Sequence, residues 1–385
     1  MFEKELKKLK NKNLVRHMIS RATTQGPVIK IKGRKYLNFS SNDYLGLACH
    51  PEIIKAVMKA VGRYGFGSGA SRLIAGGGIL HERLEKQVSG FKGTESALVF
   101  NSGYSANTGI IPAIASEGDA IFSDGLNHAS IIDGCRLSRA ETFVYRHKDI
   151  SHLKELINKV KGRRKIIVTD TVFSMDGDIA PLKEIYDTCL ILQKKHRKPD
   201  TILFYIDDAH GTGVLGNGKG GLAHFNVRPE PWIIQMGTFS KALGSFGAFV
   251  AGSKDVIQWI SNTARSFIFS TALPSCVISA SITSMRLIRT DRSLVRRLWS
   301  NRERLVEGIR DAGYDTLGSE TPIIPLRTGT IKEALRISAL LYRKGIYVPA
   351  IRPPAVREPR IRITVTAAHT ERHIDFLVNT LKEIS

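Results

Sequence analysis

The stretch "FYIDDAHGTG", residues 204–213, ends an apolar run with two carboxylates and an imidazole and then enters glycine-rich chain. Residues 202–206 are almost wholly apolar, which predicts a buried strand ending at Asp207. A bare carboxylate at that place loses hydration, at a cost on the order of several kcal/mol, unless a cation meets it. Side chains alternate along a strand, so Asp208 is expected to point to the opposite face.

Three partners for Asp207 stay open at this point. A protonated pyridine nitrogen fits, because the carboxylate would itself keep that nitrogen protonated, and His210 could then reach an oxygen on the same ring. A metal ion is the second candidate partner. The third is the histidine of a catalytic triad, which Asp207 would orient toward a serine or cysteine nucleophile. The sequence contains no G-x-S-x-G motif and no cysteine placed as a nucleophile, which disfavours the third.

Short apolar runs like this one recur and are mostly separated by stretches with helical periodicity. They lie at residues 96–100, 120–122, 142–145, 165–170, 201–207, 232–236 and 247–252. This alternation predicts an α/β fold with a mainly parallel seven-stranded sheet and helices on both faces. Ligands of such sheets bind beyond the carboxyl ends of the strands.

Beyond about residue 275 the alternation gives way to long helical segments and a few strand-like stretches. We therefore expect a large domain over residues 46–274 and a smaller C-terminal α+β domain over residues 275–385. The first part of the chain, residues 1–45, is expected to form an arm that packs on the small domain.

The composition is that of a globular protein, with 42% hydrophobic and 8% aromatic residues among 385. The N-terminal stretch lacks an apolar signal region, and no later segment approaches the roughly 18 apolar residues of a membrane span. We expect a cytoplasmic protein without a membrane partner. The four cysteines form no C-x-x-C pair, so neither a zinc site nor a disulfide framework is expected.

The formal net charge is +22. Nucleic-acid binding, attraction of polyanionic small substrates and solubility each account for such a charge. No helix-turn-helix, zinc finger or RNP-like stretch accompanies the basic residues, so a nucleic-acid partner is not expected. A phosphorylated or acidic partner remains attractive.

Polar residues follow several of the expected strands. Gly103 and Tyr104 stand at a sharp turn into a helix, whose N-terminus suits a phosphate, although a plain strand-to-helix turn explains them equally well. His128 begins another helix, either as a cap or as a flat ring stacked on an aromatic cofactor. Ser174 belongs to the loop "TDTVFSMDGDIAPL", residues 169–182, whose paired acids form either a metal site or an Asx-type turn.

Lys241 follows the run 232–236 in "GTFSKALG", residues 237–244, close behind Thr238 and Ser240. A lysine among Ala, Leu, Gly and Phe is atypical of a solvated face, and burial lowers an amine's pKa toward the range useful for a Schiff base. With Asp207 and His128 at other strand ends, this lysine predicts a pyridoxal 5'-phosphate site and no metal.

The ordered motifs resemble those of the α-oxoamine synthases, a family of fold-type I pyridoxal-phosphate enzymes. The resemblance covers nearly the whole chain. Its motifs are "NFSSNDYLGL", "GSGASRLIAG", "SGYSAN", "NHAS", "VFSMDGDIAPL", "DDAHGTGVLG", "GTFSKALG", "FSTALP" and "RIRITVTAAHT". It implies an aminotransferase-like fold and a homodimer with shared active sites.

The resemblance also implies a role for each cofactor-binding residue. Lys241 would carry the Schiff base and move the Cα proton, Asp207 would hold the pyridinium, and His128 would stack on the ring. The phenolic oxygen would be bound by His210 and Ser174. Phosphate contacts would come from Gly103, Tyr104, Thr238 and Ser240, and from Thr271 of the other subunit.

For the substrates, the resemblance implies that Arg352 grips the amino-acid carboxylate, with Asn42 nearby. Arg21, or as a second choice Arg16, would approach the acyl donor. Ala355 follows the Arg-Pro-Pro segment, at a position where many relatives have a threonine that contacts substrate, so Ala355 is expected to face the substrate without that hydroxyl.

The "IRPPAV" segment and the length are most similar to the family members that condense L-alanine with a pimeloyl thioester in biotin biosynthesis. The implied reaction is an acyl transfer with loss of carbon dioxide, and the thiol is either coenzyme A or an acyl carrier protein. A glycine-using member of the same family is the alternative enzyme. A basic nucleic-acid-binding protein is the alternative outside enzymes.

Overall fold

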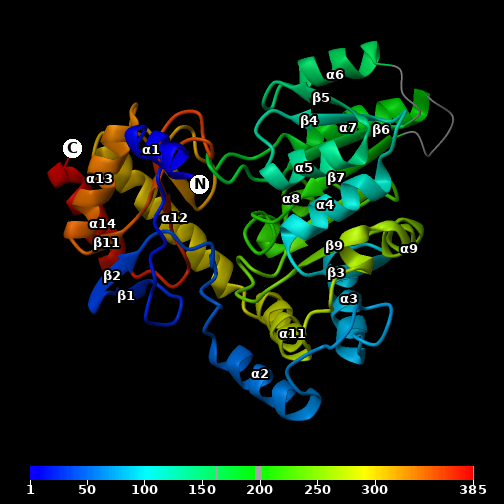
Figure 1. Cartoon of the computed structure of the whole chain (residues 1–385), viewed down its shortest axis with the longest axis horizontal. Helices are drawn as coiled ribbons and strands as arrows, with labels where there is room; N and C mark the ends of the chain where they lie inside the picture. The colour runs from blue at the N-terminus through cyan, green and yellow to red at the C-terminus, as the bar shows by residue number, and fades with distance from the viewer. Residues whose placement is uncertain (161–163, 196–201, 385) are drawn as a thin grey trace. The chain divides into compact units, whose positions relative to one another are not determined.

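The computed structural model describes residues 1–160, 164–195 and 202–384 and divides into two compact units. The large unit contains His50–Phe173 and Ile179–Arg292, and the small unit contains Met1–Cys49, Ser174–Asp178 and Ser293–Ser385. Figure 1 labels their helices and strands.

The large unit is built on a seven-stranded sheet in the order β3-β9-β8-β7-β6-β4-β5. All neighbouring pairs from β8 to β5 are parallel, and only β9 runs against its two neighbours. The strands are β3 (Ser96–Phe100), β4 (Ala120–Asp124), β5 (Glu141–Tyr145), β6 (Lys165–Asp170), β7 (Ile202–Asp207), β8 (Ile233–Thr238) and β9 (Ala248–Gly252). The predicted mainly parallel seven-stranded sheet is confirmed.

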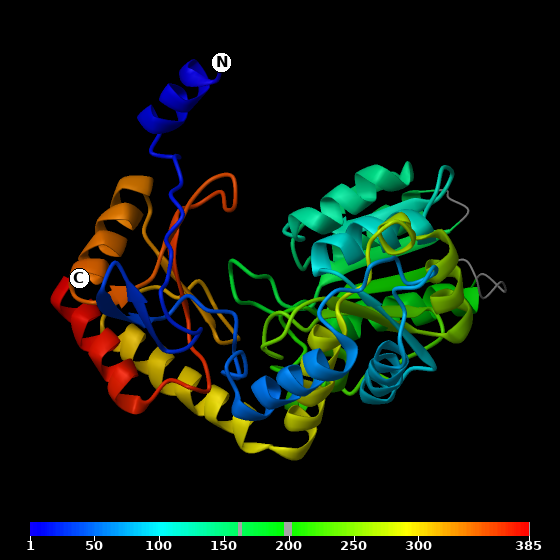
Figure 2. The same ribbon diagram turned by 60° about the horizontal axis from the view of Figure 1, so that its bottom comes forward.

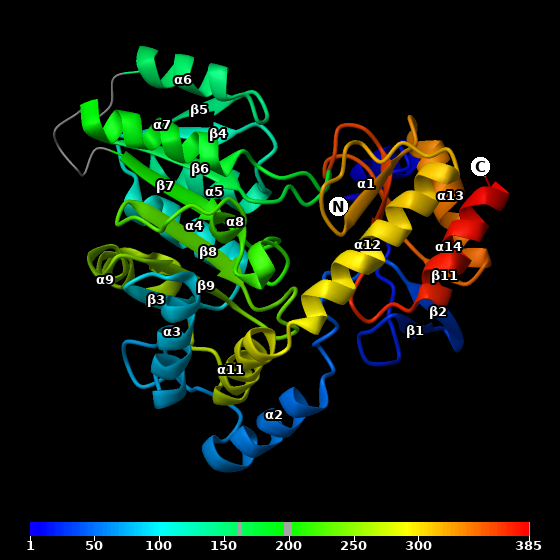
Figure 3. The same ribbon diagram turned by 180° about the vertical axis from the view of Figure 1, so that it is seen from behind.

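Helices cover both faces of this sheet (Figures 1 and 3). The helices of the large unit are α2 (Pro51–Tyr64), α3 (Ile79–Lys92), α4 (Gly103–Ile114), α5 (Ala129–Ser138), α6 (Ile150–Lys159), α7 (Leu182–Lys195), α8 (Gly221–His224), α9 (Lys254–Thr263), α10 (Arg265–Ile268) and α11 (Ser275–Thr290). A short 3-10 turn, η2, spans Gly216–Gly218.

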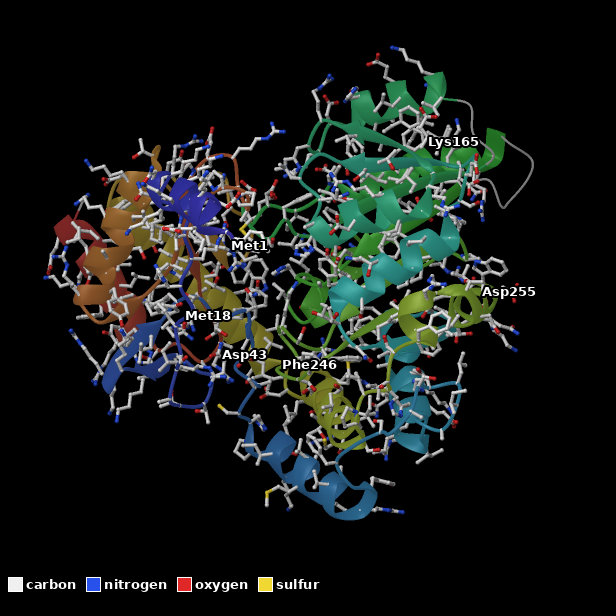
Figure 4. All side chains as sticks on the ribbon, viewed as in Figure 1. Met1, Met18, Asp43, Lys165, Phe246 and Asp255 are labelled. Carbon is white, nitrogen blue, oxygen red and sulfur yellow. The ribbon has the colours of Figure 1, made fainter. Side chains whose placement is uncertain are left out.

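The strand β7 shows how the sequence pattern makes the two faces. Tyr205 packs in the core cluster formed with α4, α5 and α9, whereas Phe204 and Ile206 pack in the cluster formed with α6 and α7. Alternate residues of a strand point to opposite faces, so Asp207 lies on the same face as Tyr205. Figure 4 labels Lys165, which marks the amino end of β6 and therefore the edge of the sheet opposite to Asp207.

The small unit contains two three-stranded sheets, in the orders β1-β2-β11 and β10-β13-β12. The strands are β1 (Val28–Ile31), β2 (Arg34–Asn38), β10 (Ile323–Arg327), β11 (Ile346–Tyr347), β12 (Ala350–Ile351) and β13 (Arg360–Thr364), and the helices are α1 (Glu3–Asn11), α12 (Ser293–Asp311), α13 (Ile331–Arg343) and α14 (Glu371–Ile384). The parallel pairing of β2 with β11 joins the N-terminal segment to the C-terminal one. The helix α1 has no buried residue and stands off from these sheets in Figure 2.

The observed grouping differs from the expected boundaries at three places, the first being residues 46–49, which belong to the small unit. Residues 275–292, which include α11, belong to the large unit, where Ser279 Oγ donates to the carbonyl of Ala56 in α2 at 3.2 Å. The loop Ser174–Asp178 belongs to the small unit, because Gly177 O accepts from Thr321 Oγ1 at 2.8 Å and from Glu320 N at 3.0 Å.

Candidate active site

The carboxyl ends of the parallel strands bring buried acids together at one edge of the large unit. Asp207 ends β7 and is the direct strand partner of Asp170, which ends β6. Both carboxyl groups are about 5% exposed or less. Burial, and then the charge of Asp207, raise the pKa of Asp170 well above its usual range.

Asp207 accepts hydrogen bonds from two neutral donors. Its Oδ2 accepts from Asn107 Nδ2 at 2.8 Å, and its Oδ1 accepts from the backbone N–H of Ala209 at 2.9 Å. These bonds hold the carboxylate in place without neutralising it. A ligand cation at this point therefore fits the site.

Asp208 has a different partner. Its Oδ2 lies 2.6 Å from Lys92 Nζ, and the two side chains are only 3% and 1% exposed. The ammonium also donates to Thr212 Oγ1 and to the carbonyl of Lys219, each at 2.8 Å. The expected separation of the two aspartates is confirmed, and Asp208 is a structural residue that secures the loop after β7.

His128 caps α5 and lies close to both acids. Its backbone N–H donates to Asp170 Oδ2 at 2.7 Å, and its ring Nδ1 lies 2.7 Å from Ser130 Oγ. Burial lowers the pKa of His128; the charge of Asp207 opposes this shift and that of Lys241 adds to it. His128 is thus the cap of α5, with its ring near Asp207, and its stacking on a cofactor ring stays a prediction.

The N-terminus of α4 forms a tight cradle. Ser102 caps the helix, and a Cβ added to Gly103 would stand 2.9 Å from Thr238 Cγ2, closer than real Cβ atoms come. The buried hydroxyl of Thr238 has no hydrogen-bond partner among the described residues. Tyr104 turns its phenol away to Asp133, which leaves its backbone at the helix start. An anion such as a phosphate would supply the acceptor that this cradle lacks.

Lys241 lies in the loop between β8 and β9, half-buried beside the fully buried Ala242 and Leu243. The loop folds back on itself through Gly244 N, which donates to Lys241 O at 2.9 Å, and continues to the exposed Phe246 (Figure 4). Ser240 is exposed, and His210 is 7% exposed in the loop after β7. The charge of Lys241 acts on both His128 and Asp170, and the apolar setting expected for its side chain stays a prediction.

Thr271 lies on an exposed part of the large unit. Its carbonyl accepts from Asn101 Nδ2 at 2.9 Å, next to the N-cap of α4, and it forms an isolated bridge with Ser71. Its side chain is open to solvent. A contact of Thr271 with the phosphate of a second subunit stays a prediction.

The remaining residues lie in the small unit, where Arg362 brings two of them together. Its Nε donates to the carbonyl of Ser174 at 2.5 Å, and its Nη2 donates to Asn42 Oδ1 at 3.2 Å. Asp176 of the same loop pairs with Arg360. No group of three His, Cys, Asp or Glu side chains in the described ranges is arranged to hold a metal ion.

Arg352 lies next to the N-terminal segment. Its Nη2 donates to the carbonyl of Val15 at 2.6 Å, while its buried Nε has no hydrogen-bond partner in the described part of the chain. Arg16 donates to the carbonyl of Pro353 at 3.2 Å, two residues before Ala355. Arg21 instead bonds the carbonyl of Thr23 and forms a bridge with Ile31. Of the two N-terminal arginines, the structure thus brings Arg16, the second choice, to the 352–355 segment.

Sequence reasoning missed four residues that organise these sites: Asn107, Ser130, Asp170 and Arg362. One signal was available for Asn107, which follows Gly103 by four positions and therefore lies on the same side of α4. Ser130 bonds Asn107 23 positions away, Asp170 bonds His128 42 positions away, and Arg362 bonds Asn42 320 positions away. No local pattern marks such pairs.

The residues of the large unit fit pyridoxal phosphate. An anion cradle with an unsatisfied buried hydroxyl, a buried carboxylate held by neutral donors and a lysine near the acids match the phosphate, the ring nitrogen and the aldehyde of that cofactor. None of the described helices is both long and apolar enough to cross a bilayer.

Comparison with known proteins agrees with this fit. Residues 34–381 match the family "Aminotransferase class I and II". The 8-amino-7-oxononanoate synthase of Geobacter sulfurreducens is 45% identical over 99% of this chain and 96% of its own length.

Two solved structures show the same fold. Serine palmitoyltransferase from S. paucimobilis, solved with bound PLP, superposes with a TM-score of 0.91 at 29% identity over 99% of this chain and 96% of its own. The 8-amino-7-oxononanoate synthase of Francisella tularensis superposes with a TM-score of 0.77 at 25% identity over 91% and 97% of the two chains. The chain therefore belongs to the aminotransferase class I and II family of pyridoxal-phosphate enzymes and, within it, to the α-oxoamine synthases that include these 8-amino-7-oxononanoate synthases.

Proposed function

We propose that this protein catalyses the decarboxylative condensation of L-alanine with a pimeloyl thioester, which yields 8-amino-7-oxononanoate, carbon dioxide and free thiol in biotin biosynthesis. The observation that carries the chemistry is the buried Asp207 carboxylate, which is held by two neutral donors at one edge of the sheet. The choice of substrates is supported by the curated relatives that carry this activity in their names.

Pyridoxal phosphate, when bound, supplies an aldehyde for the amino group of alanine and a ring that accepts the electron pair released at Cα. Asp207 keeps the ring nitrogen protonated, and the neutral His128 packs beside the ring without adding a charge. The start of α4 at Gly103 and the hydroxyl of Thr238 bind the phosphate, with Tyr104 contributing its backbone and Ser240 adding a hydroxyl.

Lys241 carries the cofactor between turnovers and takes the Cα proton of alanine as a base. The new carbon–carbon bond joins Cα to the thioester carbonyl, and the thiol leaves with the electron pair of its C–S bond. The carboxylate is then lost as carbon dioxide, and Lys241 returns the proton to Cα. His210 and Ser174 bond the phenolic oxygen of the cofactor.

The substrate-binding part of the proposal assigns the alanine carboxylate to Arg352, whose guanidinium offers a planar, bidentate fork. Asn42 lies close to that carboxylate. An N-terminal arginine approaches the acyl donor, and we now favour Arg16 over Arg21 because Arg16 contacts Pro353. Thr271 would reach the phosphate of the second subunit of a cytoplasmic homodimer.

The acyl donor is coenzyme A-bound or carrier-protein-bound. The net charge of +22 favours both donors, since each is strongly anionic, and such a charge speeds encounter more than it strengthens binding.

A panel of substrates tests the proposal. The purified protein is incubated with L-alanine or glycine and with pimeloyl-CoA, pimeloyl acyl carrier protein or acetyl-CoA, and the products are identified by mass spectrometry. We expect 8-amino-7-oxononanoate from alanine with at least one pimeloyl thioester. Turnover only of glycine with acetyl-CoA would contradict the proposal and favour the glycine-using alternative.

A further inference from the structure

Asn107 is the centre of a buried hydrogen-bond network beneath the site. It lies on α4 with 0% of its surface exposed. Its Nδ2 donates to Asp207 Oδ2 and to Ser130 Oγ, each at 2.8 Å, and its Oδ1 accepts from Tyr205 OH at 2.6 Å. Both ends of the side-chain amide are thus engaged in a buried environment.

The contacts allow only one orientation of this amide. Tyr205 OH donates to Asn107 Oδ1, and burial, which raises the pKa of Tyr205 well above its usual range, keeps the proton of this bond on the phenol. In the reversed orientation, the Asn107 oxygen would face the Asp207 carboxylate, and two acceptors would lie 2.8 Å apart.

The orientation of Asn107 also determines the proton on Ser130. Since Ser130 Oγ accepts from Asn107, its own hydroxyl proton is available for the ring of His128, whose Nδ1 lies 2.7 Å away. The backbone N–H of Ser130 points to the same nitrogen at 3.3 Å. Two donors aimed at Nδ1 leave no place for a proton on it, so the ring proton of His128 must be on Nε2.

We propose that Asn107 is a positioning residue that orients the Asp207 carboxylate and, through Ser130, holds His128 as its Nε2–H tautomer. One amide thereby sets the hydrogen bonding of both groups that flank the cofactor ring. The identity of the cofactor rests on the proposed function, but the inference does not depend on the amino acid or the acyl donor. Asn107 reaches the chemistry only through Asp207 and Ser130.

The tautomer is measured directly by NMR of the holoenzyme labelled with 15N-histidine. The signals of His128 are identified by their loss in His128→Gln. In the wild type we expect Nδ1 to show the shift of an unprotonated acceptor and Nε2 that of a protonated nitrogen. In Asn107→Ala and Ser130→Ala the two nitrogens should move toward the averaged shifts of a mixed population. A wild-type His128 protonated at Nδ1 would overturn the proposal.

Cofactor affinity distinguishes the bond from Asn107 to Asp207 from the bonds that run from Asn107 through Ser130 to His128. Asn107→Asp keeps the size of the side chain and the acceptor for Tyr205 but turns an oxygen toward Asp207. We expect it to raise the Kd for pyridoxal phosphate, titrated into the apoprotein and followed by absorbance, roughly tenfold to a hundredfold. Ser130→Ala keeps the bond between Asn107 and Asp207, so its Kd should change by less than about threefold.

Should Asn107→Asp fold poorly, Tyr205→Phe provides a milder change, because it removes only the hydroxyl that orients the amide. We expect it to weaken cofactor binding in the same direction, by roughly threefold to tenfold. Wild-type affinity in both Asn107→Asp and Tyr205→Phe would overturn the role of Asn107. None of these measurements uses alanine or an acyl thioester, so their outcome is independent of the substrate panel.

Discussion

Two adjacent aspartates at the end of β7 have separate tasks, and the alternation of side chains along a strand was sufficient to predict this. Asp207 shares a face with Tyr205 and bonds Asn107, whereas Asp208 is paired with Lys92 on α3. The partners themselves could not be predicted, because Asn107 lies 100 positions and Lys92 116 positions from its aspartate. Only the fold brings these partners together.

The two aspartates should therefore respond differently to the same substitution. In Asp207→Asn, the ring nitrogen loses the carboxylate charge that keeps it protonated. Exchange of the alanine Cα hydrogen in heavy water should therefore slow by about two orders of magnitude or more. The exchange is measured by NMR without an acyl donor. An unchanged rate would contradict the role of Asp207.

Asp208→Asn is the matched control. It leaves the buried Lys92 ammonium without its counter-charge, which should lower the free energy of unfolding by about 3–5 kcal/mol. The exchange rate per folded molecule should stay near that of the wild type, and a loss as large as that of Asp207→Asn would show that Asp208 belongs to the site.

At the scale of elements, the sheet was predictable because its buried strands read as short apolar runs between helical stretches. The phosphate cradle was predictable only in part. The turn before α4 was visible in the sequence. The approach of Gly103 to Thr238 was not visible, because Gly103 follows β3 and Thr238 ends β8, and these strands are not neighbours in the sheet. The same limit applies to Arg362, which gathers Ser174 and Asn42 from distant segments.

Gly103→Ala tests the cradle. The added methyl would lie 2.9 Å from Thr238 Cγ2, so it must displace the threonine or the start of α4. We expect the Kd for pyridoxal phosphate to rise by about tenfold or more, as titrated by absorbance. Gly90→Ala in α3 is the control, because nothing lies within 4 Å of its Cβ and alanine favours a helix. Equal affinity of both variants would count against a phosphate at this helix start.

At the scale of the whole molecule, each of the two units is assembled from separate stretches of chain. The sequence pattern predicted contiguous domains, and it could not place Ser174–Asp178 in the small unit because the loop's partners are the distant residues Glu320 and Thr321.

His369 forms a further long-range contact within that unit. Its Nδ1 accepts from Thr366 N at 3.0 Å, and its Nε2 lies 3.1 Å from the carbonyl of Asn38.

The burial of the His369 ring predicts a pH-dependent stability. Burial lowers the pKa of His369 from 6.5 to about 3, so the folded protein resists a proton that the unfolded chain accepts. The resulting stability is fully present above pH 6.5 and is lost as the pH falls from 6.5 toward 3. At pH 5 the loss is about 2 kcal/mol for this group.

Urea unfolding at pH 7.5 and pH 5 measures the effect. His369→Gln should lose about 2 kcal/mol less than the wild type over this interval, and the exposed His17→Gln should behave as the wild type. The other buried titratable groups, His81 and Asp43 among them, are common to all three proteins and cancel in the comparison. Identical pH dependence in His369→Gln and the wild type would refute the assignment.

The most direct test of the account is the fate of the alanine carboxyl carbon. L-alanine labelled with 13C at this carbon is incubated with a pimeloyl thioester, and labelled carbon dioxide and free thiol are quantified together, with Lys241→Ala as the inactive control. Decarboxylative condensation predicts that the two are released in equal amounts and that the aminoketone carries no label. Labelled pyruvate, or thiol released without labelled carbon dioxide, would contradict it.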